Sequence, residues 1–487
     1  MKEKEVFDVI IIGGGVAGSL MGISLMRKEP NLKVVIVERN ASFPKKVGES
    51  TSDISTLYFR QLQLDHLLEK HPTKAGLRFL FNENQSDQMK DVSEFNSPTL
   101  KSSIGGRHLN RQVFDEDLLL EAEKLGCLVF RPAEVVSHSL QPFDYTLEIR
   151  SEEQTHHLNA PKFLDATGRA RFLPKALGWK DLPLKLKNAA IFTRLQHPNA
   201  SLQLNEQTAS FWKQNAVNYI EYGTTHFMRK NAWFWLIRLS ENEFSIGLVL
   251  DTNHHKVSDH EAYFKAQIKE EPLLASFFSE AQHTEIQYIP QLSYCSERLF
   301  EDGATVIGDS GAFTDPFISP GLEMICQQAA YMSELFIRDF RSGKFHQKRW
   351  KKYERTFLQS YQSRDVIYTH WYSIMHDFDL LTSWMRVSLF IYFGLYTNPA
   401  YAFPKRLRLP VRSRRLSKLG VRMFIARINT LAKKRERSAN KGYKEPQVAY
   451  SGVRITNGIQ LFTLPVVLFF RWAKSYLILE WRQLTNR

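Results

Sequence analysis

The sequence predicts an α/β protein with three parts: a parallel sheet covered by helices, an inserted β-sheet domain and a mainly helical C-terminal region. Three observations predict this order. A hydrophobic run near the N-terminus ends in glycines and leads into a helical pattern, alternating aromatic strands fill the middle of the chain, and helical periodicity dominates from residue 331 onward. The chain has 487 residues, 43% hydrophobic and 24% charged, which is the length of two or three units with ordinary globular composition.

The positive charge is concentrated in one segment. The chain carries 65 basic and 51 acidic residues, a net charge of +14, and residues 405–444 alone hold fifteen Lys or Arg and one acid. The rest of the chain is therefore neutral overall. Three widely spaced cysteines exclude a disulfide framework and a cysteine-rich zinc module, and they favour a reducing compartment.

The first hydrophobic run, residues 6–12, is interpreted as a buried parallel strand. Its seven residues are too few for the core of a secretory signal followed by a cleavage site. We therefore expect a cytoplasmic protein.

A nucleotide-binding fingerprint follows this strand. Residues 13–18 match G-x-G-x-x-G, and residues 16–28 have the pattern of a helix. A second strand at 33–37 is followed directly by an acid, Glu38. The glycines let the backbone approach a diphosphate, the helix N-terminus favours the negative charge, and the acid accepts hydrogen bonds from ribose hydroxyls. The candidate cofactor-binding residues here are Gly13, Gly15, Val16, Ala17, Gly18, Glu38 and Arg39.

Two later turns distinguish FAD from NAD as the nucleotide. Asp309 ends an apolar stretch at 304–307 and precedes small residues and a helical pattern, an arrangement that can bind a ribityl hydroxyl. Residues 165–169, Asp-Ala-Thr-Gly-Arg, form another strand-end turn. A simple NAD dehydrogenase does not need these two elements, so the pattern favours FAD.

Further motifs match one family. They are Gly-Glu-Ser at 48–50, the Gly-x4-Arg segment from Gly106 to Arg111, and Trp233-Phe-Trp235-Leu-Ile-Arg238. With these motifs the chain resembles the flavin-dependent halogenases, often called tryptophan halogenases. The resemblance implies an FAD-binding Rossmann-like, hydroxylase-type fold with FAD-binding segments 1–182 and 296–340, a substrate-binding β-sheet domain at 183–295 and a basic helical region at 341–487. It adds Glu49, Ser50, Arg111, Asp309 and Gly321 to the cofactor-binding candidates.

The resemblance also implies a mechanism. A separate flavin reductase supplies reduced FAD, which with oxygen and a chloride or bromide ion yields hypohalous acid. This oxidant reaches a catalytic lysine, here Lys74, which precedes an alternating run at 77–81 that reads as a half-buried strand. Burial would lower the pKa of that amine. Trp233 and Trp235 would line the substrate pocket or tunnel, although alternation alone predicts only aromatic residues in a sheet core.

The halide loop departs from the tryptophan-acting members. The loop spans residues 315–321, in which Pro316, Ser319, Pro320 and Gly321 would lie against halide and flavin. Tryptophan-type members have a glutamate where this chain has Ile318, so the resemblance points to a phenol or pyrrole type. Pro320 has no backbone N–H, which leaves Gly321 as the donor.

Alternatives remain open on the sequence alone. A geranylgeranyl-reductase-like flavoenzyme or an aromatic flavin monooxygenase would share the nucleotide motifs. The substrate is expected to be a small aromatic molecule, hydrophobic and either free or carrier-bound.

The adjacent pairs His156-His157 and His254-His255 lack chelating spacing, so no metal is expected. Residues 387–470 combine apolar and basic stretches, which favours contact with an anionic membrane surface, on the inner face, over nucleic acid. Strands are expected at 189–195, 217–222, 233–238 and 244–250.

Overall fold

The structure is a computed structural model that describes residues 4–98, 105–197, 200, 204–215, 220–391, 430 and 447–450. The chain divides into two compact units. The first comprises Met1–His71, Leu109–Leu184 and Ser293–Asp365, and the second comprises Pro72–His108, Lys185–Leu292 and Val366–Arg487. The second unit therefore includes residues 72–108 in addition to the central segment that the sequence marks as a substrate domain.

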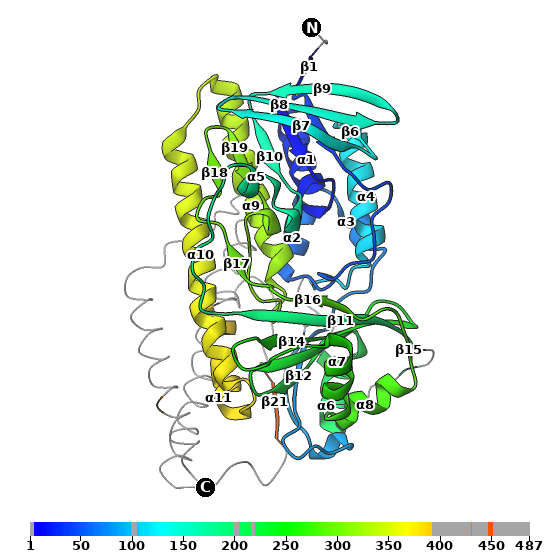
Figure 1. Ribbon diagram of the computed structural model, residues 1–487. Helices are drawn as coiled ribbons and strands as arrows, with labels where there is room; N and C mark the ends of the chain where they lie inside the picture. Colours follow the sequence, from blue (N-terminus) through cyan, green and yellow to red (C-terminus); the bar gives the residue numbers. More distant parts are fainter. Residues whose placement is uncertain are drawn as a thin grey trace. The chain divides into compact units, whose positions relative to one another are not determined.

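The first unit is built on a six-stranded sheet (Figure 1). Its neighbouring strands at residues 9–12 and 34–37 are parallel and consist of buried valine and isoleucine, as expected for strands covered on both faces. In order across the sheet the strands are β18 (Phe300–Glu301), β19 (Ala304–Val306), β10 (Phe163–Asp165), β2 (Val9–Ile12), β3 (Val34–Val37) and β6 (Leu128–Phe130).

Two smaller sheets complete the strands of this unit. The first contains β1 (Glu5–Val6), β9 (Gln154–Ala160), β8 (Asp144–Ser151) and β7 (Glu134–Gln141), and the second pairs β17 (Tyr294–Cys295) with β20 (Ala312–Phe313). The predicted strand at 6–12 is thus divided between two sheets, because β1 pairs with β9 whereas β2 pairs with β3 and β10.

Helix α1 (Val16–Lys28) has the bounds that the sequence predicts and is buried along most of its length. It packs against α4 (Arg111–Lys124) and α9 (Pro320–Ser342). Arg27 and Lys28 in its last turn complement the negative end of the helix dipole. The other helices of the unit are α2 (Asp53–Gln61), α3 (Asp65–Leu68), α5 (Phe172–Ala176) and two short 3₁₀ helices, Gly168–Ala170 and Gly308–Ser310. The unit boundary at residue 365 falls within α10 (Gln347–Ile374).

The second unit is built on a nine-stranded sheet. Along the sheet lie β15 (Gln282–His283), β11 (Asn188–Gln196), β14 (Glu243–Asp251), β13 (Ala232–Arg238), β12 (Gly223–Arg229), β4 (Gly76–Phe81), β5 (Ser93–Pro98) and β21 (Val448–Tyr450), and β16 (Gln287–Ile289) also pairs with β11. Three of the expected strands are confirmed as β11, β13 and β14. The expected strand at 217–222 is wrong at its described end, because Ile220–Tyr222 is a 3₁₀ helix and the strand begins at Gly223.

The two faces of this sheet differ in character. One face carries Leu80, Phe227, Phe234 and Ile246 and belongs to a hydrophobic core closed by α7 (His260–Lys269) and α8 (Pro272–Ser279). By strand alternation, Phe79, His226, Trp233 and Trp235 lie on the other face. The remaining described elements of the unit are α6 (Glu206–Asn215), α11 (Phe378–Ile391) and the 3₁₀ helix Met89–Asp91.

The strand predicted at 77–81 is confirmed as β4, but the prediction that it is half-buried is wrong, because both of its faces are buried. Arg78 is 1% exposed and forms an ion pair with the fully buried Glu94. The pair satisfies the charge of the arginine inside the core.

Among the described residues no helix is long and apolar enough to cross a membrane. The basic segment at 405–444 and nearly all of 387–470 lie outside the described residues.

Candidate functional site

The glycine turn of the first unit has the geometry of a diphosphate site. Gly13 adopts φ +97°, and a Cβ on Gly18 would lie 1.9 Å from the Gly13 carbonyl oxygen, so both positions require glycine. Gly15 precedes α1, whose first turn has neither a capping side chain nor an acid. Val16 and Ala17 open this turn. The N–H groups there are therefore available to an anion.

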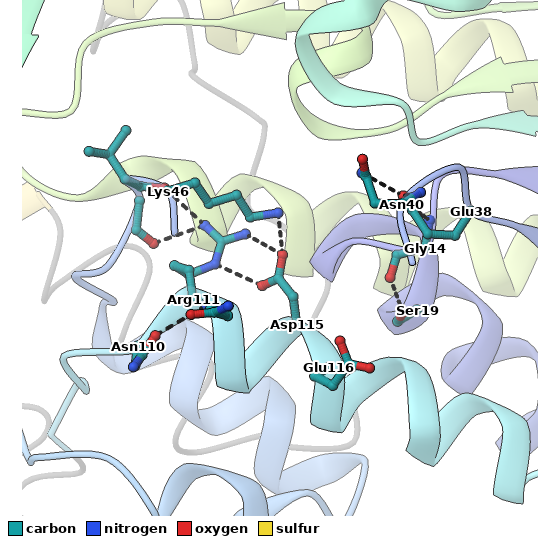
Figure 2. Close-up of polar contacts among 12 residues, drawn as sticks. Gly14, Ser19, Glu38, Asn40, Lys46, Asn110, Arg111, Asp115 and Glu116 are labelled. Atoms are coloured by element: carbon teal, nitrogen blue, oxygen red, sulfur yellow. Dashed lines mark hydrogen bonds and ion pairs between the residues drawn. The ribbon is translucent and has the colours of Figure 1, made fainter. Parts of the chain in front are cut away.

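Glu38 lies at the end of β3, where the fingerprint places it, and is buried. Its Oε2 accepts the Gly14 N–H at 2.7 Å and its Oε1 accepts the backbone and side-chain N–H groups of Asn40 at 2.9 and 2.8 Å (Figure 2). Carboxylate oxygens can accept further hydrogen bonds, so a ribose hydroxyl can still be bound. The side chain of Arg39 is exposed.

A strap at residues 47–50 is attached to the start of α4. The Arg111 Nη1 donates to the carbonyls of Val47 at 3.4 Å and Gly48 at 3.1 Å, and the Leu109 N–H donates to the Glu49 carbonyl at 2.7 Å. Glu49 is buried and Ser50 is half-buried. The guanidinium of Arg111 also binds both oxygens of Asp115. Arg111 therefore holds the strap in place.

The two strand-end aspartates have different roles. Asp165 is enclosed: its oxygens accept N–H groups of Thr167 and Leu173 and the Thr167 hydroxyl at 2.7–2.8 Å. The Asp309 carboxylate, in contrast, accepts no hydrogen bond from the described part of the chain. Burial raises the pKa of Asp309, against the attraction of nearby cations that include Arg169 and Arg111. Such a group, half-buried and unsatisfied, is suited to a ligand hydroxyl.

The predicted halide loop lies in the same unit and ends at α9. Ser319 adopts the left-handed φ of 57°, and its N–H donates to the Pro316 carbonyl at 2.8 Å. Pro320 is the first residue of α9 and has no N–H to offer. Apart from its chain neighbours and the backbone of its own helix, no heavy atom of the described residues lies within 4 Å of the position that a Cβ on Gly321 would take. The loop therefore leaves open space at the one glycine that was expected to face halide and flavin.

Lys74 belongs to the second unit and is held on a short antiparallel ladder. Thr73 pairs with Arg107, the Lys74 N–H donates to the Gly106 carbonyl at 2.9 Å, and the next N–H, of Ala75, donates to Tyr222. Strand β4 starts at Gly76, one residue before the start predicted at residue 77. The lysine is only 6% exposed.

His108 lies diagonally across this ladder from Lys74. Its Nδ1 is 3.0 Å from the Arg238 carbonyl, which can only accept, and its Nε2 is 3.1 Å from the Thr224 hydroxyl. Burial, reinforced by the charge of Lys74, lowers the pKa of His108 to about 3. The ring is therefore neutral near pH 7, with the proton on Nδ1.

The two predicted tryptophans lie on the aromatic face of the nine-stranded sheet. Their ring centroids are 6.1 Å apart, and both are buried. The Trp233 indole N–H donates to the Tyr372 hydroxyl at 3.1 Å and that of Trp235 donates to the Ser245 hydroxyl at 3.0 Å. Both indole N–H groups are therefore satisfied within the second unit.

Comparison with known proteins identifies the family. The profile described as tryptophan halogenase matches residues 8–92 and 82–378, well over half of the chain. The chain belongs to the tryptophan halogenase family.

Curated halogenases align with much of the chain. The flavin-dependent halogenase chlA of Dictyostelium discoideum is 26% identical over 375 residues, covering 68% of this chain and 60% of the Dictyostelium protein. The 1H-pyrrole-2-carbonyl-peptidyl-carrier-protein chlorinase of Pseudomonas fluorescens is 24% identical over 380 residues, covering 72% of this chain and 79% of the chlorinase.

A solved structure has a similar fold. The crystal structure of halogenase PltM in complex with phloroglucinol and FAD superposes with a TM-score of 0.70 at 19% identity, covering 99% of this chain and 93% of PltM. The predicted FAD-binding Rossmann-like fold is thereby confirmed. FAD is the cofactor of this family and halide its co-substrate, and the open glycine turn and the unsatisfied Asp309 suit FAD.

The motifs of the halogenase family did not reveal every residue at these sites. Lys46 contacts Asp115 beside the glycine turn, His226 stacks on Phe79 with ring centroids 4.5 Å apart, and Tyr372 binds Trp233. The alternation of residues 224–228 would have indicated that His226 lies on the face of Trp233 had the strand been placed correctly. No sequence signal marks Tyr372.

Proposed function

We propose that this chain halogenates an electron-rich, phenolic or pyrrole-like aromatic ring, with Lys74 as the catalytic residue. The observation that carries the proposal is a lysine that is 6% exposed and held at the start of β4 beside the neutral His108. Lysine is among the residues that are least often buried, so a buried lysine beside a neutral ring is a candidate for a catalytic amine. When bound, reduced FAD with oxygen and halide supplies the electrophilic halogen.

The residues around Lys74 would orient the amine. The ladder fixes its backbone through Gly106, while His108, bound to Thr224 and Arg238, offers an uncharged ring beside the amine. A neutral neighbour adds no repulsion to the ammonium form and can neither gain nor lose a proton near pH 7. Lys74 would therefore be the group that holds and moves a proton in the second unit.

The substrate class follows from the halide loop and the relatives. Ile318 provides no carboxylate, so activation would come from the hydroxyl or ring nitrogen of the substrate itself. The names of two relatives agree with this class: one chlorinates a pyrrole on a carrier protein, and another was crystallised with phloroglucinol. The substrate is proposed to be a small aromatic molecule, free or carrier-bound.

The test supplies a flavin reductase, NADH, FAD, oxygen and bromide or chloride with a panel of phenols and pyrroles, and detects halogenated product by mass spectrometry. Lys74→Met is expected to lower product formation at least ~100-fold, the scale of losing a positioned catalytic group, with unchanged FAD binding. Lys90→Met, a change at an exposed lysine of the same unit, serves as the control. Product formation by Lys74→Met at the wild-type rate would remove Lys74 from the mechanism.

We also retain the hypothesis that residues 387–470 contact an anionic membrane, on charge pattern alone. Sedimentation with phosphatidylglycerol vesicles at low and high salt tests it, and full recovery of the protein in the supernatant at low salt contradicts it.

A further inference from the structure

One buried carboxylate in the first unit is shared by two cations. The side chain of Asp115 on α4 is fully buried, and its oxygens accept the Nε and Nη2 groups of Arg111 at 2.9 and 3.1 Å. The ammonium of Lys46 forms an ion pair with the same carboxylate (Figure 2). Although burial alone would raise the pKa of Asp115, the two cations lower it below the ordinary value. The carboxylate is therefore ionised at neutral pH. The triad of Lys46, Asp115 and Arg111 then carries one excess positive charge.

This triad lies at the N-terminus of α1. A Cβ on Gly15, the residue before the helix, would lie 3.5 Å from the Lys46 Nζ and 3.6 Å from the Asp115 Oδ2. The first turn of α1 has neither a capping side chain nor an acid. The ammonium is thus beside the N–H groups and the positive end of the helix dipole. This is the place where the glycine turn would receive the diphosphate of FAD.

The two cations differ in their freedom to move. Arg111 is 12% exposed and is also bound to the strap carbonyls of Val47 and Gly48. Lys46 is 35% exposed and has a flexible four-carbon stem with three donor hydrogens. An ammonium can contact a carboxylate and a phosphate together or pass from one to the other. The structure therefore distinguishes a largely buried cation, which holds the strap, from a more exposed lysine that also lies 5.3 Å from the centroid of the Phe43 ring.

We propose that Lys46 is an exchangeable counter-ion, which pairs with Asp115 and passes to the dinucleotide diphosphate when FAD binds. Asp115 competes with the diphosphate for this ammonium and thereby limits the affinity for FAD. Limited affinity suits an enzyme that receives reduced flavin from another protein. The inference concerns flavin binding only, so it can fail or hold independently of halogenation.

The first test measures the dissociation constant for FAD by flavin fluorescence in three variants. Lys46→Met removes a charge-assisted contact and is expected to weaken FAD binding about 10- to 100-fold. Lys46→Arg keeps the charge and should restore most of the affinity. Lys45→Met changes net charge equally at the neighbouring exposed residue and should leave affinity within about twofold. If Lys45→Met and Lys46→Met weaken FAD binding equally, the effect comes from the net charge of the chain and not from a contact of Lys46. That outcome would overturn the proposal.

The second test separates the diphosphate from the rest of the ligand. Isothermal titration calorimetry with ADP and with adenosine, which lacks phosphate, compares wild type with Lys46→Met. The proposal requires that ADP lose affinity and adenosine not, and that the salt dependence of ADP binding decrease. Equal weakening of both ligands would indicate a distorted turn instead. FAD binding by Lys46→Met at wild-type affinity would also overturn the proposal, and thermal melting of each variant establishes that it is folded.

Discussion

The Arg111 Nη1 lies where the side chain of residue 48 would begin: a Cβ on Gly48 would be 2.6 Å from it, closer than non-bonded atoms approach. Gly48 also adopts φ +95°, which side chains disfavour. The guanidinium can donate to the carbonyls of the strap only because residue 48 lacks a side chain. The conformation of the strap and the position of the Arg111 guanidinium therefore depend on each other.

Gly48→Ala is expected to displace the strap and weaken FAD binding by at least ~10-fold, because it adds backbone strain of about 1–2 kcal/mol and a clash with Arg111. FAD titration by fluorescence measures this effect. Gly178→Ala provides the control, since Gly178 adopts φ +64° with no neighbour within 4 Å of its Cβ position. It should cost similar stability without changing flavin affinity. If both variants bind FAD equally, Gly48 does not organise the strap.

The buried ion pair between Arg78 and Glu94 makes the second unit sensitive to the loss of one partner. Arg78→Met leaves the carboxylate of Glu94 fully buried without its cation, although that carboxylate still accepts the Thr208 hydroxyl at 2.8 Å. We expect the free energy of unfolding to fall by ~3–5 kcal/mol, measured by urea denaturation. Arg150→Met breaks an exposed pair with Glu134 and should cost less than about 1 kcal/mol. Equal losses of unfolding free energy in the two variants would contradict the conclusion that the buried ion pair stabilises the second unit.

The sequence predicts those elements that local pattern determines. Helix α1 is predicted to the residue, because glycines precede it and Glu29-Pro30 ends it. Strand β12 is missed because Gly223 and the threonines after it resemble a turn. They form a strand only through parallel pairing with β4, which is far away in the sequence.

The site residues also fall into those that local sequence pattern predicts and those that only the folded chain brings together. Glycine and acid positions follow motif spacing, so Gly13, Gly18 and Glu38 were foreseeable. Lys46 and Lys45 cannot be distinguished by sequence, and only the path of the chain brings one ammonium to Asp115. The pairing of His108 with Thr224 and Arg238 likewise depends on three segments that meet only in the folded sheet.

His108 should make stability depend on pH. Its folded-state pKa of about 3 lies below the ordinary value of 6.5, so the unfolded chain binds the proton more readily. The contribution is fully present above pH 6.5 and is lost as the pH falls toward 3. Replacing His108 with Gln should flatten the dependence of unfolding free energy on pH in this window by up to about 1.4 kcal/mol per pH unit. Denaturation at pH 7, 6, 5 and 4 measures the slope.

The control for this slope is His138→Gln, a change at an exposed histidine of the first unit. It should leave the pH dependence unchanged. A slope in His108→Gln equal to that of the wild type would mean that the ring of His108 titrates normally in the folded chain.

Pro320 offers a test of the halide loop. At the first position of α9 proline supplies no N–H, and the Ser319 N–H is already bound to the Pro316 carbonyl. Pro320→Ala adds one donor beside Gly321, whose Cβ position has no contact within 4 Å from the described residues outside its own helix backbone and chain neighbours. We expect the KM for bromide and chloride to fall several-fold, since one added hydrogen bond to an anion contributes about 1 kcal/mol. Pro272→Ala makes the same change at the start of α8 in the second unit and should leave both KM values unchanged. A halide KM in Pro320→Ala equal to that of wild type would place the halide away from this helix terminus.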